Sequence, residues 1–438
     1  MLTRKLFLLL SPVILFACAE ESTEMSAPTP QPAMVDLTTQ TVPDQGFVIN
    51  NARILDGMGG VIENGSLVVQ GNRIVAVNEG ESMVEGALEI DAEGRTVMPG
   101  FIDAHRHIIT GEDPEAWMAE DAEDAMQAFL EAGFTTVLSA GDAPQILDLR
   151  RMTAENEIAG PRIIAASFTG LAAGGGGGGP EGDPARFDVA RPPMRPTEPA
   201  TALPEEAVRG QIQALYDRGY DAAKNVIIVT PDGPEEAALN MIVEETNRLG
   251  IRTITHAVTV TDTLAAVRAD VDQLVHTPHI EMLTEEQAQF IADSGIPMTS
   301  TLGIFVPFFD ENNEPIFRDY LPFPWETILS AGQGPVNARL LWEAGVVLGF
   351  GTDTRYDPEL TLNHELKSLY LVFSEQDILQ IMGENAAINI AMEDELGTLE
   401  AGKLADIVLV NGDPLDDLFD LLNVEVVIKD GAFMVDNR

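Results

Sequence analysis

Cysteine and basic residues are scarce in this sequence. Cys18 is the only cysteine, which excludes an intrachain disulfide and a metal site built from several thiolates. Lysine and arginine together number 25 against 71 aspartates and glutamates, which gives a formal net charge of -46. A chain so acidic repels a phosphate backbone, so we expect no nucleic-acid partner. The acidic residues are spread along the chain, which indicates a solvated acidic surface rather than a charged tail.

The first apolar run is short. Arg4 and Lys5 precede residues 6–17, a run too short for a membrane-spanning helix, which ends in Leu-Phe-Ala directly before Cys18. This pattern resembles a bacterial lipoprotein signal. The resemblance implies that Cys18 carries lipid and that the protein is anchored in the cell envelope, on the periplasmic face of the outer membrane. An ordinary secretory signal with an incidental cysteine is the alternative.

The chain is long enough to bury a large core, with 438 residues of which 45% are hydrophobic. Strand-like and helix-like segments alternate in its middle, which is typical of parallel βαβ units. Eight such strands predict an α/β fold, a TIM-like (β/α)8 barrel, between two β-rich ends. The strands are expected to begin near residues 97, 134, 162, 220, 252, 272, 297 and 346. The helices are expected near 115–132, 143–157, 204–218, 234–249, 261–269, 284–294 and 325–344.

Candidate metal ligands stand at the ends of these strands. His105 and His107 end the first strand, and because strand side chains alternate between faces the two imidazoles share one face. The other candidates lie in or after the fourth, fifth, sixth and eighth strands: Lys224, His256, His276 and Asp353. A single histidine at a strand end is more often structural. In a closed barrel, however, all six side chains would meet at the C-terminal rim, where such barrels hold their active sites.

The stretch Pro99-Gly-Phe-Ile-Asp-Ala-His105 resembles the first-strand motif of the amidohydrolase superfamily, and the six candidates match that superfamily's ligand set in order. The imidazolonepropionase-like and Xaa-Pro dipeptidase-like members are the most similar. The resemblance implies that the two β-rich ends pair into one composite β-sandwich. The expected domains are a signal (1–17), a flexible tether (18–45), the sandwich (46–95 and 392–438) and the barrel (96–391).

Lys224 needs its own explanation, because an ammonium group with a pKa of about 10.4 would repel divalent cations. Residues 220–224 resemble the fourth-strand motif of members in which carbon dioxide converts this lysine into a carbamate. The carbamate would bridge two ions, one held by His105, His107 and Asp353 and the other by His256 and His276. Zinc suits imidazole and oxygen ligands, with manganese or cobalt as alternatives. A single metal beside an ordinary Lys224 is the other possibility.

These groups predict hydrolysis of an amide (C-N) bond in a small molecule such as a dipeptide or an N-acyl amino acid. A hydroxide bridging the metals would be the nucleophile, since coordination lowers the pKa of water to about 7. Asp353 would be the general base and then the general acid. Two weaker candidates could contact substrate, namely His279 and Arg355. Each has a plain alternative, a loop-capping residue for His279 and a surface salt bridge for Arg355.

Two other functions remain open at this point. Deaminases of nucleobase-like rings in the superfamily resemble this chain but use one metal, and they usually have a glutamate three residues after the fifth-strand histidine. Here that position is Thr259. A ligand-binding lipoprotein without catalysis is the second alternative, and the intact ligand set speaks against it. The sequence leaves the oligomeric state open, a homo-oligomer included.

Overall fold

The computed structural model describes residues 36–173, 198–306 and 330–438. Two sheets organise these residues: a barrel sheet of parallel strands surrounded by helices, and a mixed sheet formed by both ends of the chain. In the ranges described, no helix combines the length and the apolar character needed to cross a membrane.

The barrel sheet contains eight strands in chain order. These are β6 (Phe101–Arg106), β7 (Phe134–Ala140), β8 (Arg162–Phe168), β11 (Ala222–Val226), β12 (Arg252–His256), β13 (Gln273–Val275), β14 (Met298–Thr299) and β15 (Leu348–Gly349). The residues that follow β15 lie against β6, where Ala104 N donates to Phe350 O at 3.0 Å and Asp353 N donates to His105 O at 2.7 Å. These bonds join the two ends of the sheet, so the predicted TIM-like barrel is confirmed.

Helices follow the strands. They are α1 (Pro114–Glu120), α2 (Ala122–Glu131), α3 (Ile146–Ala154), α4 (Glu205–Arg218), α5 (Glu235–Leu249), α6 (Val260–Arg268), α7 (Glu285–Asp293) and α8 (Ser330–Ala344). Three more follow β15, namely α9 (Pro358–Leu369), α10 (Glu375–Met382) and α11 (Glu384–Asn389). The single helix expected over 115–132 is two helices, because Asp121, with φ -117° and ψ -18°, ends α1 and begins α2.

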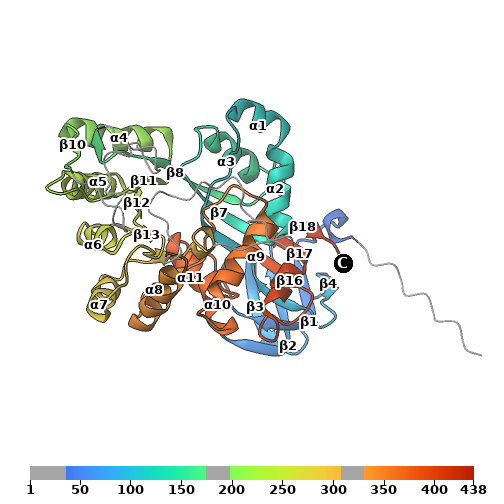
Figure 1. Ribbon diagram of the computed structural model, residues 1–438. Coiled ribbons are helices and arrows are strands. Elements are labelled where there is room, and N and C mark those ends of the chain that lie inside the picture. The colour runs from blue at the N-terminus through green and yellow to red at the C-terminus, as the bar shows by residue number, and fades with distance from the viewer. Residues whose placement is uncertain (1–35, 174–197, 307–329) are drawn as a thin grey trace, which may run out of the picture. The chain divides into compact units, whose positions relative to one another are not determined.

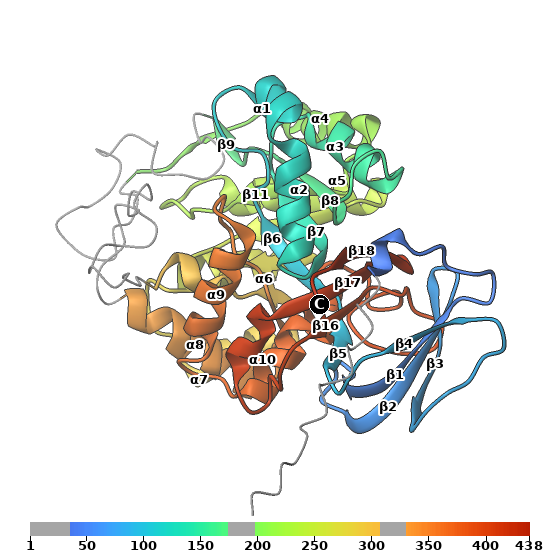
Figure 2. The same cartoon turned by 90° about the vertical axis from the view of Figure 1, so that its right-hand side faces the viewer.

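The other sheet combines the two β-rich ends of the chain, as Figure 2 shows for the blue and red strands. From the first end come β1 (Phe47–Leu55), β2 (Val61–Gln70), β3 (Arg73–Glu79), β4 (Leu88–Asp91) and β5 (Thr96–Pro99). From the last come β16 (Ile407–Val410), β17 (Val424–Lys429) and β18 (Ala432–Asp436). The order is β18-β17-β16-β5-β1-β2-β3, with β4 also paired to β1. Apolar residues from both ends share one core.

The first predicted strand divides between the two sheets. Residues 96–99 form β5, which pairs with β16 and β1, and only from Phe101 does the chain join the barrel. Gly100 lies at the crossing, where its N donates to Asp406 O at 2.8 Å. A Cβ there would lie 2.3 Å from Thr135 Oγ1, so the crossing requires glycine. Arg162 also joins the sheets, because its guanidinium contacts Asp406 and Asp430 at 2.7 Å each.

Residues 36–45, expected within the tether, pack on the mixed sheet instead. The short 3-10 helix η1 (Leu37–Thr39) contacts β18, Leu37 is buried, and its N donates to Asp436 Oδ2 at 2.7 Å. The expected signal and the first part of the tether lie outside the described residues. The remaining short elements are β9 (Ala172–Ala173), β10 (Thr201–Ala202), η3 (Leu302–Ile304) and η4 (Leu418–Leu422).

Candidate metal centre

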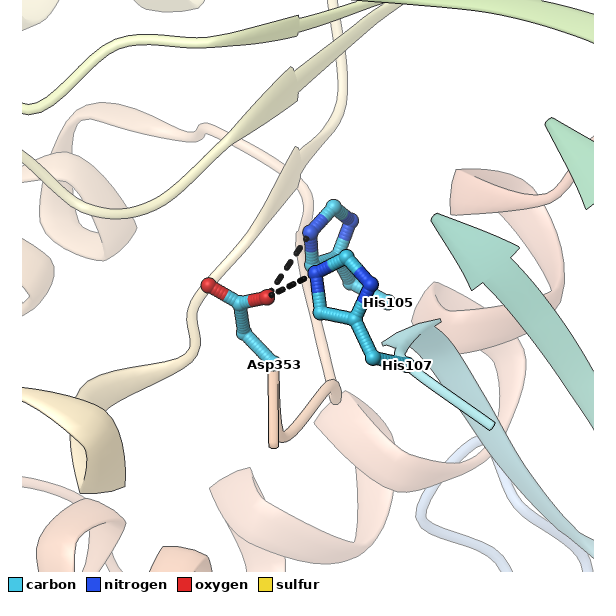
Figure 3. Close-up of side chains that lie close together, drawn as sticks. All are labelled: His105, His107 and Asp353. Carbon is cyan, nitrogen blue, oxygen red and sulfur yellow. Dashed lines mark ion pairs between the residues drawn. The ribbon is translucent and has the colours of Figure 1, made fainter. Parts of the chain in front are cut away.

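His105, His107 and Asp353 form the centre of the candidate site. Nε2 of His107 lies 3.1 Å from Oδ1 of Asp353, and Nε2 of His105 lies 3.3 Å from the same oxygen (Figure 3). One ligand atom from each of the three lies within 4.8 Å of the others, which is the spacing of a group able to hold a metal ion. The three residues that we expected to hold one metal ion, from the first and eighth strands, therefore lie close enough together to do so.

His276 faces the second oxygen of the same carboxylate. Its Nε2 lies 3.5 Å from Asp353 Oδ2, is buried, and has no hydrogen-bond partner among the residues that the structure describes. Its Nδ1 lies 2.6 Å from Thr301 Oγ1. An imidazole that donates to a hydroxyl through Nδ1 presents the lone pair of Nε2 to the site, as metal-binding histidines do. His256 lies beside it, with 4.2 Å between the two ring centroids.

Lys224 projects from β11 into the same cluster. Its Nζ lies 3.0 Å from His105 Nε2, and the side chain is 2% exposed. Burial lowers the pKa of Lys224 from 10.5 to about 7, although Asp353 opposes this shift. A substantial fraction of the amine is therefore neutral near pH 7, which is the form that can react with carbon dioxide. Lys224, His276 and His256 thus lie beside the group of His105, His107 and Asp353, and their role as metal ligands stays a prediction.

The pKa shifts in this cluster favour the protonation states that bind a cation. Burial and the nearby Lys224 lower the pKa of His105 to about 3, and burial also lowers the pKa values of His256 and His276. Burial alone would raise the pKa of Asp353, but the neighbouring histidines hold it well below its ordinary value. Neutral imidazoles and an ionised carboxylate are the forms that bind divalent metals. With the orphaned Nε2 of His276, this donor set fits zinc.

The two weaker candidates lie differently. His279 is fully buried and stacks on Phe305, with 3.6 Å between ring centroids. Arg355 is exposed, and the described part of the chain offers its guanidinium no ion pair. A role in substrate binding stays a prediction for both residues.

Arg106, which sequence reasoning did not single out, supports the site from behind. It lies between the two histidines in sequence, points to the other face of β6, and is 2% exposed. Its Nη1 donates to hydroxyls on both sides of Asp353, those of Thr352 and Thr354. A signal was present: both faces of a parallel barrel strand are buried, so an arginine within one requires buried partners.

Comparison with known proteins assigns the family. Residues 96–434 match the model of the amidohydrolase family, so this chain belongs to that family. Among curated proteins it is similar to the imidazolonepropionase of Caldanaerobacter subterraneus subsp. tengcongensis, with 23% identity over 419 residues, covering 84% of this chain and 89% of that protein. The family is metal-dependent, in agreement with the cluster of histidines and aspartate.

Solved structures share the fold. A putative prolidase from Bifidobacterium longum superposes with a TM-score of 0.72 at 23% identity, covering 90% of this chain and 97% of that chain. A Xaa-Pro dipeptidase with methionine bound in its active site superposes with a TM-score of 0.69 at 23% identity, covering 88% and 99%. These similarities support the barrel with its flanking sheet and leave the substrate open.

Proposed function

We propose that this metal-dependent amidohydrolase cleaves the amide bond of a dipeptide or an N-acyl amino acid. The observation that carries the proposal is the convergence of three imidazoles on the single carboxylate of Asp353, with the Lys224 amine 3.0 Å from Nε2 of one of them, His105. These groups come from four barrel strands or the residues that follow them, β6, β11, β13 and β15, and they meet where barrel enzymes perform their chemistry.

Two metal ions bound by this cluster would polarise the substrate carbonyl and acidify a water molecule. The protein's own side chains would transfer the proton. Asp353 is ionised, because the surrounding histidines lower its pKa. It can therefore accept the proton of the attacking water and deliver it to the amine as the C-N bond breaks. The carbamate of Lys224 would supply the negative charge that two cations require.

The surroundings of the cluster favour a substrate with a carboxylate. Arg355 lies two residues after Asp353, is exposed, and has no ion-pair partner among the described residues although the chain carries a net charge of -46. A guanidinium binds a carboxylate through two parallel hydrogen bonds. A dipeptide and an N-acyl amino acid both end in such a group.

The local structure after His256 disfavours ring deamination. Thr259, in the position of the deaminase glutamate, caps α6 instead: its hydroxyl donates to Asp262 Oδ2 at 2.6 Å and accepts from Asp262 N at 3.0 Å. The intervening Ala257 and Val258 are buried and apolar. This segment therefore offers no acid to protonate a ring.

The test is a substrate screen with the full-length protein loaded with zinc, manganese or cobalt. We expect release of free amine from dipeptides or N-acyl amino acids, and loss of that release in Asp353→Asn. Arg355→Met should raise KM for substrates with a free carboxylate and leave their amidated counterparts unaffected. Ammonia release from aminated rings without amide cleavage would overturn the proposal.

We also propose, on the sequence of residues 1–18 alone, that the protein is a lipid-anchored envelope protein. Radiolabelled palmitate should enter the wild-type protein during expression in a bacterial host, and Cys18→Ala should abolish its incorporation. Export of both proteins without label would indicate an ordinary secretory signal.

A further inference from the structure

Arg106 is a buried cation behind the candidate metal centre. Its guanidinium lies 5.1 Å from the centroid of the Phe129 ring on α2, and among the described residues it forms no direct ion pair. The charges of four carboxylates act on it without a direct ion pair, namely Asp103, Asp357, Asp142 and Asp353. Burying a charge costs free energy unless it is well hydrogen-bonded, so the contacts of this guanidinium indicate why it is there.

Those contacts concentrate on one short segment. Nη1 of Arg106 lies 3.0 Å from the hydroxyl oxygen of Thr352 and 3.1 Å from that of Thr354, and Nη2 donates to the carbonyl oxygen of Tyr356. A fourth bond, to Thr361 Oγ1 at 2.6 Å, connects the same guanidinium to α9. Three of the four acceptors therefore lie in residues 352–356, the segment that carries Asp353.

Asp103 holds the same segment from the other side. Its Oδ2 accepts from Thr352 Oγ1 at 2.7 Å, and its Oδ1 accepts from the N of Thr352 and the N of His105 at 3.1 Å each. A continuous path of hydrogen bonds therefore runs from Arg106 through Thr352 to Asp103. The path connects the strand that carries the two histidines to the segment that carries the carboxylate.

The backbone around Asp353 is also bonded to β6, since the N atoms of Thr352 and Asp353 donate to His105 O at 3.2 and 2.7 Å and His107 N donates to Thr354 O at 3.2 Å. The preceding strand, β15, contains only Leu348 and Gly349, so its ladder contributes few hydrogen bonds. Asp353 itself has φ +49°, in the left-handed region that residues with a side chain rarely adopt. We therefore expect the side-chain contacts of Arg106 and Asp103 to act together with these backbone bonds in holding this conformation.

We propose that Arg106 is a positioning residue that keeps the Asp353 carboxylate in the metal centre by holding Thr352, Thr354 and Tyr356 in place. The inference rests on the proposed roles of Asp353 as ligand and proton carrier. Arg106 itself touches no reacting atom. Its planar guanidinium contacts four acceptors through Nη1 and Nη2, a fixed geometry that an ammonium group does not reproduce.

The test compares Arg106→Met and Arg106→Lys with Arg162→Met. Arg162 is a matched control, because it is also a largely buried arginine on a barrel strand but pairs with Asp406 and Asp430 of the mixed sheet. Three properties are measured on the full-length protein: zinc affinity, the absorption spectrum of the cobalt form, and hydrogen exchange of residues 350–361. Thr354→Val and Thr361→Val form a second comparison. Each removes one hydroxyl that Arg106 contacts, the first on the segment that carries Asp353 and the second on α9.

We expect Arg106→Met to weaken zinc binding about 10- to 100-fold, as is typical when support for a ligand is removed. The cobalt spectrum should change, residues 350–361 should exchange faster, and kcat should fall with little change in KM. Arg106→Lys should recover part of the loss. Thr354→Val should reproduce the effect more strongly than Thr361→Val, and it tests the inference even if Arg106→Met does not fold.

Wild-type zinc affinity and exchange in folded Arg106→Met, or equal effects in Arg162→Met, would overturn the inference. The outcome is separable from that of the proposed function. If no amide is cleaved but Arg106→Met still loses zinc affinity and exchange protection, the positioning role stands and the amidase proposal fails. If amides are cleaved and Arg106→Met behaves as wild type, the amidase proposal stands and the positioning role of Arg106 fails.

Discussion

Nζ of Lys224 and Nε2 of His105 lie 3.0 Å apart in a buried cluster, although their residues are on strands that are not neighbours in the barrel. We predict that Lys224→Met loses one of two bound metal equivalents, because no other side chain is expected to bridge the ions. Its activity should fall by more than the roughly 10- to 100-fold typical of residues that only support a ligand. Metal content by mass spectrometry and kcat/KM are the measurements.

The matched control is Lys429→Met, which removes another buried lysine. Its Nζ lies 3.4 Å from Thr153 O, and it belongs to β17 of the mixed sheet. This control should lower stability without changing metal content. Added bicarbonate should increase metal uptake by wild type and not by Lys224→Met, and an equal response in both proteins would exclude the carbamate.

Asp353→Asn should lower kcat by about 100- to 10,000-fold, the range contributed by a positioned acid or base. The amide cannot carry the proton, and it offers one ligand oxygen where the carboxylate offers two. Asp357→Asn is the control, because Asp357 caps α9 by accepting from Leu360 N at 3.0 Å, and asparagine caps helices equally well. Comparable kcat values for the two variants would contradict a catalytic Asp353.

Removal of metal should lower the melting temperature. A ligand present at 100 times its dissociation constant stabilises the folded state by about 2.7 kcal/mol, so we expect a loss of several degrees after chelation and recovery with zinc. His107→Ala should show a smaller loss, since it lacks one of the ligands facing Asp353. Calorimetry of both proteins with and without chelator is the measurement, and an unchanged wild-type melting curve would argue against a resident metal.

The buried carboxyl group of Glu365 should make the stability of the folded protein depend on pH. Its buried carboxylate accepts from Leu302 N and Ser300 Oγ, and burial raises its pKa from 4.5 to about 8. The folded protein therefore holds this proton to a higher pH than the unfolded chain does. The contribution of Glu365 to stability is greatest below about pH 4.5 and declines as the pH rises to about 8.

Glu365→Gln mimics the protonated carboxyl group, so its unfolding free energy should decline less than that of wild type between pH 5 and pH 9. Glu359→Gln, on the exposed side of the same helix, is the control and should follow wild type. Urea unfolding at several pH values measures the difference. Parallel curves for wild type and Glu365→Gln would show that the carboxylate stays ionised throughout.

The barrel and the cluster could be predicted because both depend on local patterns. Alternation in the first strand places His105 and His107 on one face, and parallel strands bring their C-terminal ends to one rim. The division at Gly100 could not be predicted in this way. Residues 97–102 form one continuous apolar run, and only pairing with residues 407–410, far along the chain, assigns its first part to the other sheet.

The supporting residues were missed for the same reason. Thr361 and Glu365 lie on α9, a helix that sequence reasoning did not predict, and their contacts reach Arg106 and the loop after β14. No short motif encodes contacts between such distant residues. Arg106 could have been found, because a charged side chain on the outward face of a barrel strand must be buried beneath helices.

The pairing of β5 with β16 also bears on the order of assembly during translation. The ribosome makes residues 407–410 near the end of synthesis, so the strand that leads into His105 lacks its antiparallel neighbour while most of the nascent polypeptide is already exposed. We therefore expect a metal ion held by His105 and His107 to bind late, after residues 407–410 have paired with β5.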